Sequence, residues 1–551
     1  MSAPSHVSAE SVNVASALVE ALLAHGIDSG FGIPSIHNIA LYDALRQRPQ
    51  FQHWIARHEQ AATFAADGFC HRSGKPAVVF ASTGPGNLFT LAGLLESFQT
   101  NTPLILVGTN VASSILGKTC GALHETPQQL EIIRPLTRFA TRISRPEDIP
   151  DAVASAAKAD GPAFIEIPHD VLLAPCGTAA PGCADESPKT DEIEQAVTHI
   201  HQSRTPAIVA GSSVDTDDAV AALKQLAETL HAPVLTTTSG KGVFADDHPL
   251  SMGCISRLGA AQEVLAHSDL LISIGARFTE FDTGRFSLKA PAQQVQIDQS
   301  PEHVGFPFPA AAKLFGNISA IVQGITGSLK SRQPWCDVAA IRAQERKRLE
   351  SLNADAYSAL MLLREALDRD DVVANDQSIL NYWASTFFPV LAPRTFLYPS
   401  GSGTLGYGLP AAIGAACANQ RTGRNTRVIC IAGDGGFQYT SHELATLAQY
   451  NLPVKILLVN DNSYGIIGFL QRTMFGHTHE VQLKNPDFCV LAEAYGIPAQ
   501  RVTDLDGLRH QLASWINARG PALLEWRTEL KAPWEAGAVN RPTGLQPGGK
   551  N

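Results

Sequence analysis

The chain has 551 residues, of which 44% are hydrophobic and 17% are charged, as in an ordinary globular protein. This composition excludes a fibrous or intrinsically disordered chain. The net charge of −10 comes from 42 Lys and Arg against 52 Asp and Glu without a basic block, so no nucleic-acid partner is expected. At about 150 residues per domain, the length predicts three or four domains.

No signal for a membrane or for secretion is present. No run of apolar residues is long enough for a transmembrane helix, and the N-terminal segment MSAPSHVSAESVN is polar where a signal peptide would be apolar. The nine cysteines are scattered, odd in number and without a C-x-x-C pair, so neither a disulfide framework nor a zinc site is indicated. We expect a cytoplasmic protein with no membrane partner.

The first block, residues 1–174, alternates short apolar runs with helical patterns. Strands are predicted at Ala77–Ser82, Leu104–Thr109 and Ala163–Pro168, and an amphipathic helix at Val14–Ala24. This alternation is typical of a parallel α/β sheet. Ala174–Asp191, rich in Pro, Gly and Ala, then predicts a linker.

Two further blocks repeat this architecture, over residues 192–328 and 355–540. The charged run Ile341–Leu352, a predicted helix, separates them, and the tail Arg541–Asn551 is expected to be disordered. We therefore predict an α/β protein of three doubly wound parallel-sheet domains. The strands expected in the two blocks are Pro206–Gly211, Pro233–Thr238, Leu270–Gly275, Gln294–Asp298, Thr395–Tyr398, Arg427–Ala432 and Val454–Asn460.

Oxygen-bearing residues follow two consecutive strands of the third block. The strand at 427–432 leads into Gly433–Gly436 (GDGG), before a helical pattern that starts at Ser441, and the strand at 454–460 leads into Asn460–Gly465 (NDNSYG). Adjacent parallel strands would bring Asp434 and the second cluster together at the C-terminal edge of the sheet, where ligands bind. Either motif alone would be an ordinary turn or loop, but the two together favour a Mg²⁺ and phosphate site.

The segment Gly401–Gly406 (GSGTLG) imitates a Rossmann dinucleotide motif before the predicted helix Leu409–Ala418. Such a site needs an acidic residue about twenty positions further on. No Asp or Glu occurs between Gly401 and Asp434, so we reject the nicotinamide interpretation.

A carboxylate in the first block, Glu59, stands between the apolar pair Trp54-Ile55 and the helical pattern Ala61–Cys70. By itself such a residue is an ordinary helix-start carboxylate that interacts with the helix dipole. A tight turn, Thr83–Asn87 (TGPGN), follows the next strand.

Together these stretches resemble the thiamine-diphosphate-dependent 2-oxo acid decarboxylase and acetolactate synthase superfamily over essentially the whole chain. The matching segments are RHEQAATFAADGF with STGPGN, SGSGTLGYGLPAAIGA, GDGGF and NDNSYG. The resemblance implies a pyrimidine-binding, a middle and a diphosphate-binding domain, with thiamine diphosphate and Mg²⁺ as cofactors. It also implies a homodimer, often paired to a homotetramer, with active sites at the subunit interface.

The resemblance also assigns roles. Glu59 would bond the pyrimidine nitrogen and promote the imino tautomer that removes the thiazolium C2 proton. Asp461 departs from the usual Asn of the family, a change that adds negative charge beside the metal. The other implied residues are Leu405, which bends the cofactor; the Gly403 carbonyl, which accepts from its amine; Asp434, Asp461 and the Ser463 carbonyl, which ligate Mg²⁺; Gly435, Gly436 and Ser378, which donate to the diphosphate; and Asn87, on the pyrimidine side.

The resemblance implies decarboxylation of a 2-oxo acid, after which the enamine is protonated to an aldehyde or ligated to a carbonyl acceptor. Residues 121–127 resemble acetolactate synthases with His124 in place of a Gln, whereas Leu470 stands where synthases place a Trp. Residues 32–37 and 123–125 resemble decarboxylases of longer 2-oxo acids, including the guanidino-oxopentanoate type. His37 and His124 would then be proton donors, although a histidine is more often structural or on the surface.

We therefore expect a decarboxylase that acts on a small 2-oxo acid and releases an aldehyde. The alternatives are acetolactate synthase proper and, from a different class, a catalytically idle subunit that binds the cofactor or regulates a partner. FAD is a further cofactor that the resemblance allows in the middle domain, where Arg277 and Asp298 stand at strand ends. The turn at Gly211-Ser-Ser, however, is less glycine-rich than a typical dinucleotide turn.

Overall fold

The structure is a computed structural model, and it describes residues 13–176, 190–256, 259–284, 286–301 and 308–539. The chain divides into two compact units, Met1–Asp185 and Glu186–Asn551. The expected linker lies mostly outside the described residues, and so does the tail Arg541–Asn551. No helix within the described ranges combines the length and the apolar character that a bilayer crossing requires.

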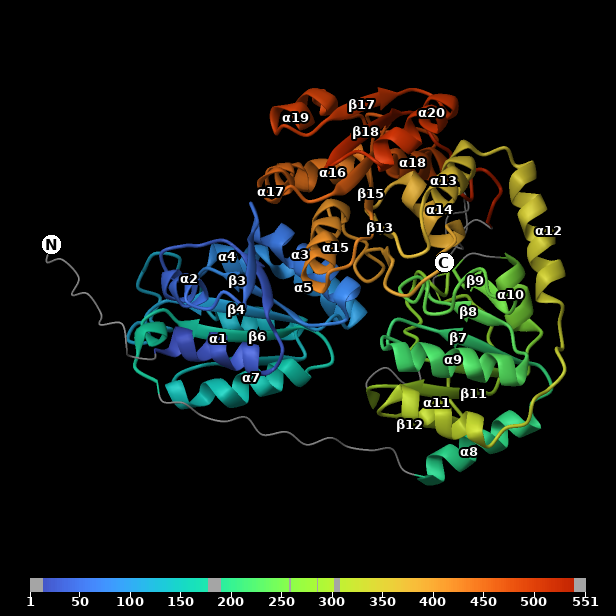
Figure 1. Cartoon of the computed structure of the whole chain (residues 1–551), viewed down its shortest axis with the longest axis horizontal. Helices are drawn as coiled ribbons and strands as arrows, with labels where there is room; N and C mark the ends of the chain where they lie inside the picture. Colours follow the sequence, from blue (N-terminus) through green and yellow to red (C-terminus); the bar gives the residue numbers. More distant parts are fainter. Residues whose placement is uncertain (1–12, 177–189, 257–258, 285, 302–307, 540–551) are drawn as a thin grey trace, which may run out of the picture. The chain divides into compact units, whose positions relative to one another are not determined.

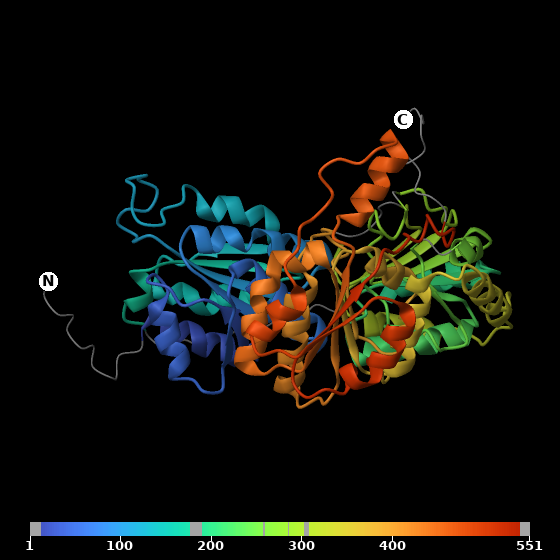
Figure 2. The ribbon, with the colours of Figure 1, turned by 90° about the horizontal axis from the view of Figure 1, so that it is seen from above.

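The first unit is built on one six-stranded, wholly parallel sheet of order β2-β1-β3-β4-β6-β5, flanked by helices (Figures 1 and 2). Its strands are β1 (Ser29–Gly32), β2 (Gln52–Ile55), β3 (Ala77–Ala81), β4 (Leu104–Asn110), β5 (Phe139–Arg142) and β6 (Ala163–Pro168). Its helices are α1 (Val14–Ala24), α2 (Ile39–Arg46), α3 (Glu59–Ser73), α4 (Pro85–Phe89), α5 (Leu91–Thr100), α6 (Gln129–Ile133) and α7 (Ile149–Lys158). Because β3, β4 and β6 are buried on both faces, they have continuous apolar sequences.

The second unit holds two more six-stranded parallel sheets, of order β12-β11-β10-β7-β8-β9 and β14-β13-β15-β16-β18-β17 (Figure 1). The strands of the former are β7 (Pro206–Ala210), β8 (Val234–Thr236), β9 (Ser251–Cys254), β10 (Leu270–Ile274), β11 (Gln294–Asp298) and β12 (Ala312–Phe315). Those of the latter are β13 (Val372–Asn375), β14 (Phe396–Leu397), β15 (Val428–Gly433), β16 (Val454–Asn460), β17 (Ala499–Val502) and β18 (Ala522–Arg527).

The helices of the second unit begin at residues suited to cap them. Thr216, Asp337, Ser378 and Asp504 each accept a backbone N–H of the helix that follows. The helices are α8 (Thr190–Gln202), α9 (Asp217–Leu230), α10 (Gly259–Ala266), α11 (Ile318–Gly327), α12 (Val338–Ser351), α13 (Asp355–Ala366), α14 (Ile379–Phe387), α15 (Gly408–Thr422), α16 (Asp434–Thr440), α17 (Leu444–Tyr450), α18 (Gly465–Phe475), α19 (Phe488–Ala494) and α20 (Leu505–Ile516).

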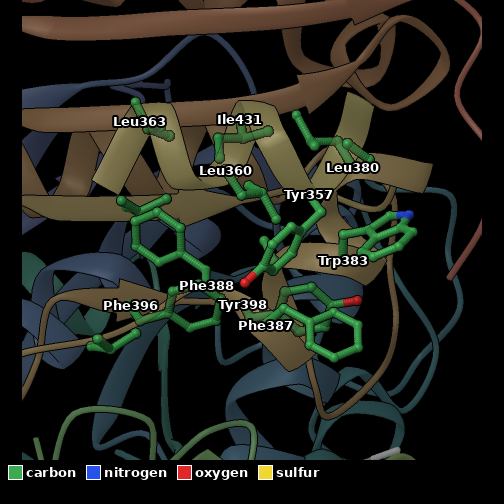
Figure 3. Close-up of a cluster of buried hydrophobic side chains, with 14 of the residues drawn as sticks. Tyr357, Leu360, Leu363, Leu380, Trp383, Phe387, Phe388, Phe396, Tyr398 and Ile431 are labelled. Carbon is green, nitrogen blue, oxygen red and sulfur yellow. The ribbon is translucent and has the colours of Figure 1, made fainter. Parts of the chain in front are cut away.

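A shared hydrophobic core explains why the two sheets of the second unit form one compact body. One cluster of buried side chains runs from β7 and β10 of the middle sheet to α13, α14 and the strands of the third sheet. Figure 3 shows its aromatic part around Trp383, Phe387 and Phe388. Trp383 is fully buried, and its indole N–H donates to the Lys531 carbonyl at 2.8 Å.

The predicted fold class is confirmed, and every strand named from the sequence is present within one or two residues of its predicted ends. The helical pattern predicted from Ser441 is present, but a further helix precedes it. Helix α16 begins directly at Asp434, and residues 441–443 form a 3-10 turn before α17. The glycines of the GDGG motif obscured this helix because glycine has low helix propensity.

Candidate active site

Two carboxylates meet at the C-terminal edge of the third sheet. Asp434 is the first residue of α16 after β15, and Asp461 directly follows β16, which pairs with β15 in parallel. Burial raises the pKa of Asp461 to about 7, and the nearby charge of Asp434 adds to that rise. Burial likewise raises the pKa of Asp434. The sequence prediction that these groups lie side by side is therefore confirmed.

The carboxylates line a cavity of about 280 Å³ at this edge. Its opposite wall is apolar, with Ile466, Ile467 and Leu530. A small organic molecule that carries phosphate fits such a mixture of oxygen ligands and apolar surface. The cavity also brings together the remaining residues that the sequence placed on the diphosphate side, namely Ser378, Gly403, Leu405, Gly435, Gly436 and Ser463.

Asp376, which the sequence analysis missed, holds the loop that carries Gly403 and Leu405. It directly follows β13, is fully buried, and accepts the backbone N–H groups of Gly406 and Gly408 at 3.1 Å each. A Cβ on Gly436 would lie 2.4 Å from the Asp376 carboxylate, so only glycine fits there. Its position at the end of a buried strand was the available signal, but the run VVAND resembles an ordinary strand end.

Asn485 is a second residue that the sequence analysis missed. Its side-chain amide donates to the Asp434 carboxylate at 2.6 Å, with longer contacts to Asn460 at 3.4 Å and Asn462 at 3.3 Å. The backbone around it is tied to the 460–465 turn, since Leu483 N–H donates to the Asn462 carbonyl at 2.7 Å. Asn485 thus fixes the orientation of Asp434 from a segment over twenty residues away in the chain.

The hydroxyl of Ser378 has a local partner. It caps α14 by accepting from Asn381 N–H at 3.4 Å, and it donates to the Asn381 side chain at 2.5 Å. A Cβ on Gly433 would lie 2.7 Å from the Ser378 Cβ, so this side chain sits directly over the end of β15. Ser378 therefore lies at the cavity, and its hydroxyl is bonded to Asn381.

Glu59 lies at the corresponding edge of the first sheet. It starts α3, and His58 caps that helix by accepting from Gln60 N–H at 3.2 Å. The Glu59 carboxylate packs against the turn after β3, 3.2 Å from where a Cβ of Gly86 would stand. Among the described residues its carboxylate has no hydrogen-bond partner, so it is available to a ligand.

Asn87, the other residue predicted on the pyrimidine side, is fully buried. Its amide nitrogen donates to the Thr109 carbonyl at 2.9 Å, which ties the turn after β3 to the end of β4. Its amide oxygen has no hydrogen-bond partner among the described residues. Asn87 therefore stabilises the turn after β3.

The two predicted histidines lie together in the first unit, and the structure adds a third. The ring centroids of His37 and His124 are 5.3 Å apart, and His169 lies 5.1 Å from His37. Burial lowers the pKa of His37, and the neighbouring His169 and His124 lower it further. The carbonyl of His124 packs against Gly84, where a Cβ would be 2.1 Å away. His169 directly follows β6, so counting strand ends would have found it.

The residues present fit the expected cofactor. Asp434 and Asp461 are buried acids at close quarters, an arrangement that a divalent cation would stabilise by removing their mutual repulsion. Gly435 and Gly436 line the cavity in the first turn of α16, and backbone N–H groups at a helix start are suited to bind phosphate. Asp434 and Asp461 would hold the divalent cation, and Gly435 and Gly436 would donate to the diphosphate.

Close backbone contacts restrict the space at the expected flavin position in the middle sheet. It would lie where the strand order changes direction between β7 and β10. A Cβ on Gly211 would be 2.2 Å from the Gly275 carbonyl, and Ser213 N–H donates to that carbonyl at 3.2 Å. Of the two residues predicted to contact FAD, Asp298 ends β11 and is buried, and Arg277 follows β10. FAD stays a prediction.

Parallel α/β sheets, with two carboxylates and glycine turns around one cavity, are typical of proteins that bind a phosphate-bearing cofactor. Three family models identify the family of this chain. The thiamine pyrophosphate enzyme N-terminal TPP binding domain matches residues 12–132, the central domain matches 193–325, and the C-terminal TPP binding domain matches 376–526. The chain belongs to the thiamine pyrophosphate enzyme family.

Curated relatives agree with this assignment. The chain is 34% identical to a probable 2-ketoarginine decarboxylase of Pseudomonas aeruginosa, over 93% of each chain. It is 32% identical to a probable acetolactate synthase large subunit of Methanocaldococcus jannaschii, over 93% of this chain and 91% of the relative. It is 30% identical to the acetolactate synthase isozyme 2 large subunit of Escherichia coli, over 95% of this chain and 97% of the relative.

A solved structure shares the fold. A putative thiamin diphosphate-dependent enzyme from Mycobacterium smegmatis superposes with a TM-score of 0.79 over 94% of this chain and 100% of its own, at 23% identity.

Proposed function

We propose that the protein decarboxylates a 2-oxo acid with thiamine diphosphate and Mg²⁺ and releases the product as an aldehyde. Release as an aldehyde is supported by the cluster of His37, His124 and His169, which lies at the same sheet edge as Glu59. A simple decarboxylase must deliver a proton to the carbon that loses CO₂, and imidazole is the side chain best suited to do so near neutral pH. The similarity to a probable 2-ketoarginine decarboxylase supports this choice.

Different residues of this chain have different roles in this proposed reaction. Bound thiamine diphosphate supplies the electron sink for the loss of CO₂. Asp434, Asp461 and the Ser463 carbonyl would hold Mg²⁺, while the apolar wall of the cavity excludes water. Glu59 would hold a proton at the pyrimidine nitrogen.

We also propose that two subunits complete each active site, in a homodimer that pairs to a homotetramer. Mixing Glu59→Gln and Asp434→Ala subunits tests the shared site. Each mixed dimer then has one intact site and one doubly defective site, so random exchange should restore about a quarter of the wild-type activity. No recovery despite proven subunit exchange would place the whole site within one chain.

The test of the reaction is CO₂ release from a panel of 2-oxo acids, with products identified, using cofactor-free protein with and without thiamine diphosphate and Mg²⁺. The panel includes pyruvate, branched 2-oxo acids and 2-ketoarginine. We expect cofactor-dependent CO₂ with an equal amount of aldehyde. Glu59→Gln should abolish this turnover while the protein still melts as wild type. If no substrate gave cofactor-dependent CO₂, the alternative of a catalytically idle subunit would be favoured.

Acetolactate synthase is the second candidate, because two of the relatives carry that name. Its product would be acetolactate from pyruvate, formed without free aldehyde. Leu470, on α18, weighs against it, since the resemblance places a Trp there that shapes the acceptor pocket. Acetolactate as the main product would show that the protein is an acetolactate synthase and not a simple decarboxylase.

A further inference from the structure

A second cavity, of about 600 Å³, lies within the second unit. It is enclosed by the segment after β8, the strand β9, the helices α12 and α13, and the C-terminal end of α14. No residue of the first cavity lines it. Its volume is in the range of pockets that hold small organic ligands.

A buried cation, Lys241, lies in the wall of this cavity. The residue is 3% exposed, and its ammonium group makes no hydrogen bond or ion pair with any described residue. The ring of Phe396 lies beside it, with its centroid 5.4 Å from the Lys241 nitrogen. A largely buried cation at the cavity wall without a protein partner is available to pair with an anion that enters the cavity.

Three other charged groups of the wall have partners within the chain. Asp246 accepts from Val390 N–H at 2.8 Å, and Glu345 pairs with Arg348 at 2.7 Å. Arg342 donates to the carbonyl of His248 at 3.2 Å. None of these acids is bonded to Lys241, which leaves its charge for a molecule that enters the cavity.

Besides the charged residues Arg346, Glu350, Arg364, Glu365 and Arg509, the remaining wall has a large apolar part. It includes the thioethers of Met252 and Met361 and the rings of Tyr357, Phe387 and Phe388. The three aromatic residues belong to the cluster that Figure 3 shows. Lys241 beside this apolar surface suits a molecule with a negative charge and a hydrophobic body, and Arg346, Arg364 and Arg509 add positive charge elsewhere in the wall.

We propose that this cavity binds an amphipathic monocarboxylate, whose carboxylate pairs with Lys241 and whose apolar body packs on the aromatic wall. The site is separate from the proposed catalytic one and does not depend on the reaction assigned there. Helix α14 borders both cavities, with Tyr382 at the first and Phe387 at the second. An occupant of the second cavity therefore contacts an element of the first.

The test measures binding of 4-phenylbutanoate by calorimetry, with the neutral 4-phenylbutanamide as the matched ligand. We expect saturable binding of the acid at or below about 1 mM and at least about tenfold weaker binding of the amide, because the amide cannot pair with Lys241. Lys241→Met should reduce the affinity for the acid by about tenfold or more. Lys313→Met removes an exposed lysine of the same sheet and should bind as wild type.

Further measurements guard against failed folding and against binding at the wrong site. Met361→Trp keeps the charge but fills the cavity, so it should also lose the acid while melting as wild type. Saturating thiamine diphosphate, Mg²⁺ and a 2-oxo acid should leave the affinity for the acid unchanged. Displacement by these molecules, equal binding of acid and amide, unchanged affinity in folded Lys241→Met, or no saturable binding would each overturn the proposal.

Discussion

Replacement of Asn485 by Ala tests whether the metal site depends on a residue far from it in sequence. The amide of Asn485 donates to Asp434 at 2.6 Å, a hydrogen bond to a charged acceptor, and its two other contacts are longer than 3.2 Å. Loss of a partner that orients a metal ligand typically reduces metal affinity about 10- to 100-fold, or roughly 1.4–2.7 kcal/mol. We expect Asn485→Ala to reduce Mg²⁺ affinity by this amount, in the presence of thiamine diphosphate.

The assay is calorimetric titration of Mg²⁺ into protein that already contains thiamine diphosphate, with the melting temperature as a check on folding. Asn517→Ala is the matched control, because its amide donates only to the Ala513 carbonyl at the exposed end of α20. The control should bind Mg²⁺ as wild type. An affinity within about twofold of wild type in Asn485→Ala would show that Asp434 needs no such support.

Three further changes have defined outcomes. Gly436→Ala would place a Cβ 2.4 Å from the Asp376 carboxylate, so thiamine diphosphate affinity should fall by about tenfold or more in a fluorescence titration, whereas Gly327→Ala, which meets nothing within 4 Å, should change nothing. Trp383→Ala removes a fully buried indole from the core in Figure 3 and should cost about 3–5 kcal/mol, seen as a lower midpoint in urea; an unchanged midpoint would contradict the packing. Burial lowers the pKa of Lys455 from 10.5 to about 8, so between these pH values the unfolded chain holds a proton that the folded protein has released. The stability of wild type relative to Lys455→Met should therefore rise with pH across this window, and a flat or falling difference in melting temperature would refute the shift.

The sequence determined the architecture and half of the site. Strands buried on both faces, such as β4 and β16, have continuous apolar runs that cannot be mistaken for solvent-exposed segments. Several strands were not predicted. Among them, β5 and β17 at the sheet edges have half-exposed residues that alternate too little over four positions, whereas β13 and β18 are buried and were missed all the same. The two carboxylates proposed to hold Mg²⁺ could be placed together from the sequence because parallel strands bring consecutive strand ends to one edge.

Tertiary structure alone decided which distant residues support these groups. Asp376, Asn485 and His169 reach their partners through contacts between segments far apart in the chain, and no local spacing encodes such contacts. The second cavity has the same origin, since Lys241 follows a strand of the middle sheet and its apolar wall comes from helices of the third. A sequence specifies the periodicity that buries each element, whereas the positions of side chains that meet across elements follow only when the whole core has packed.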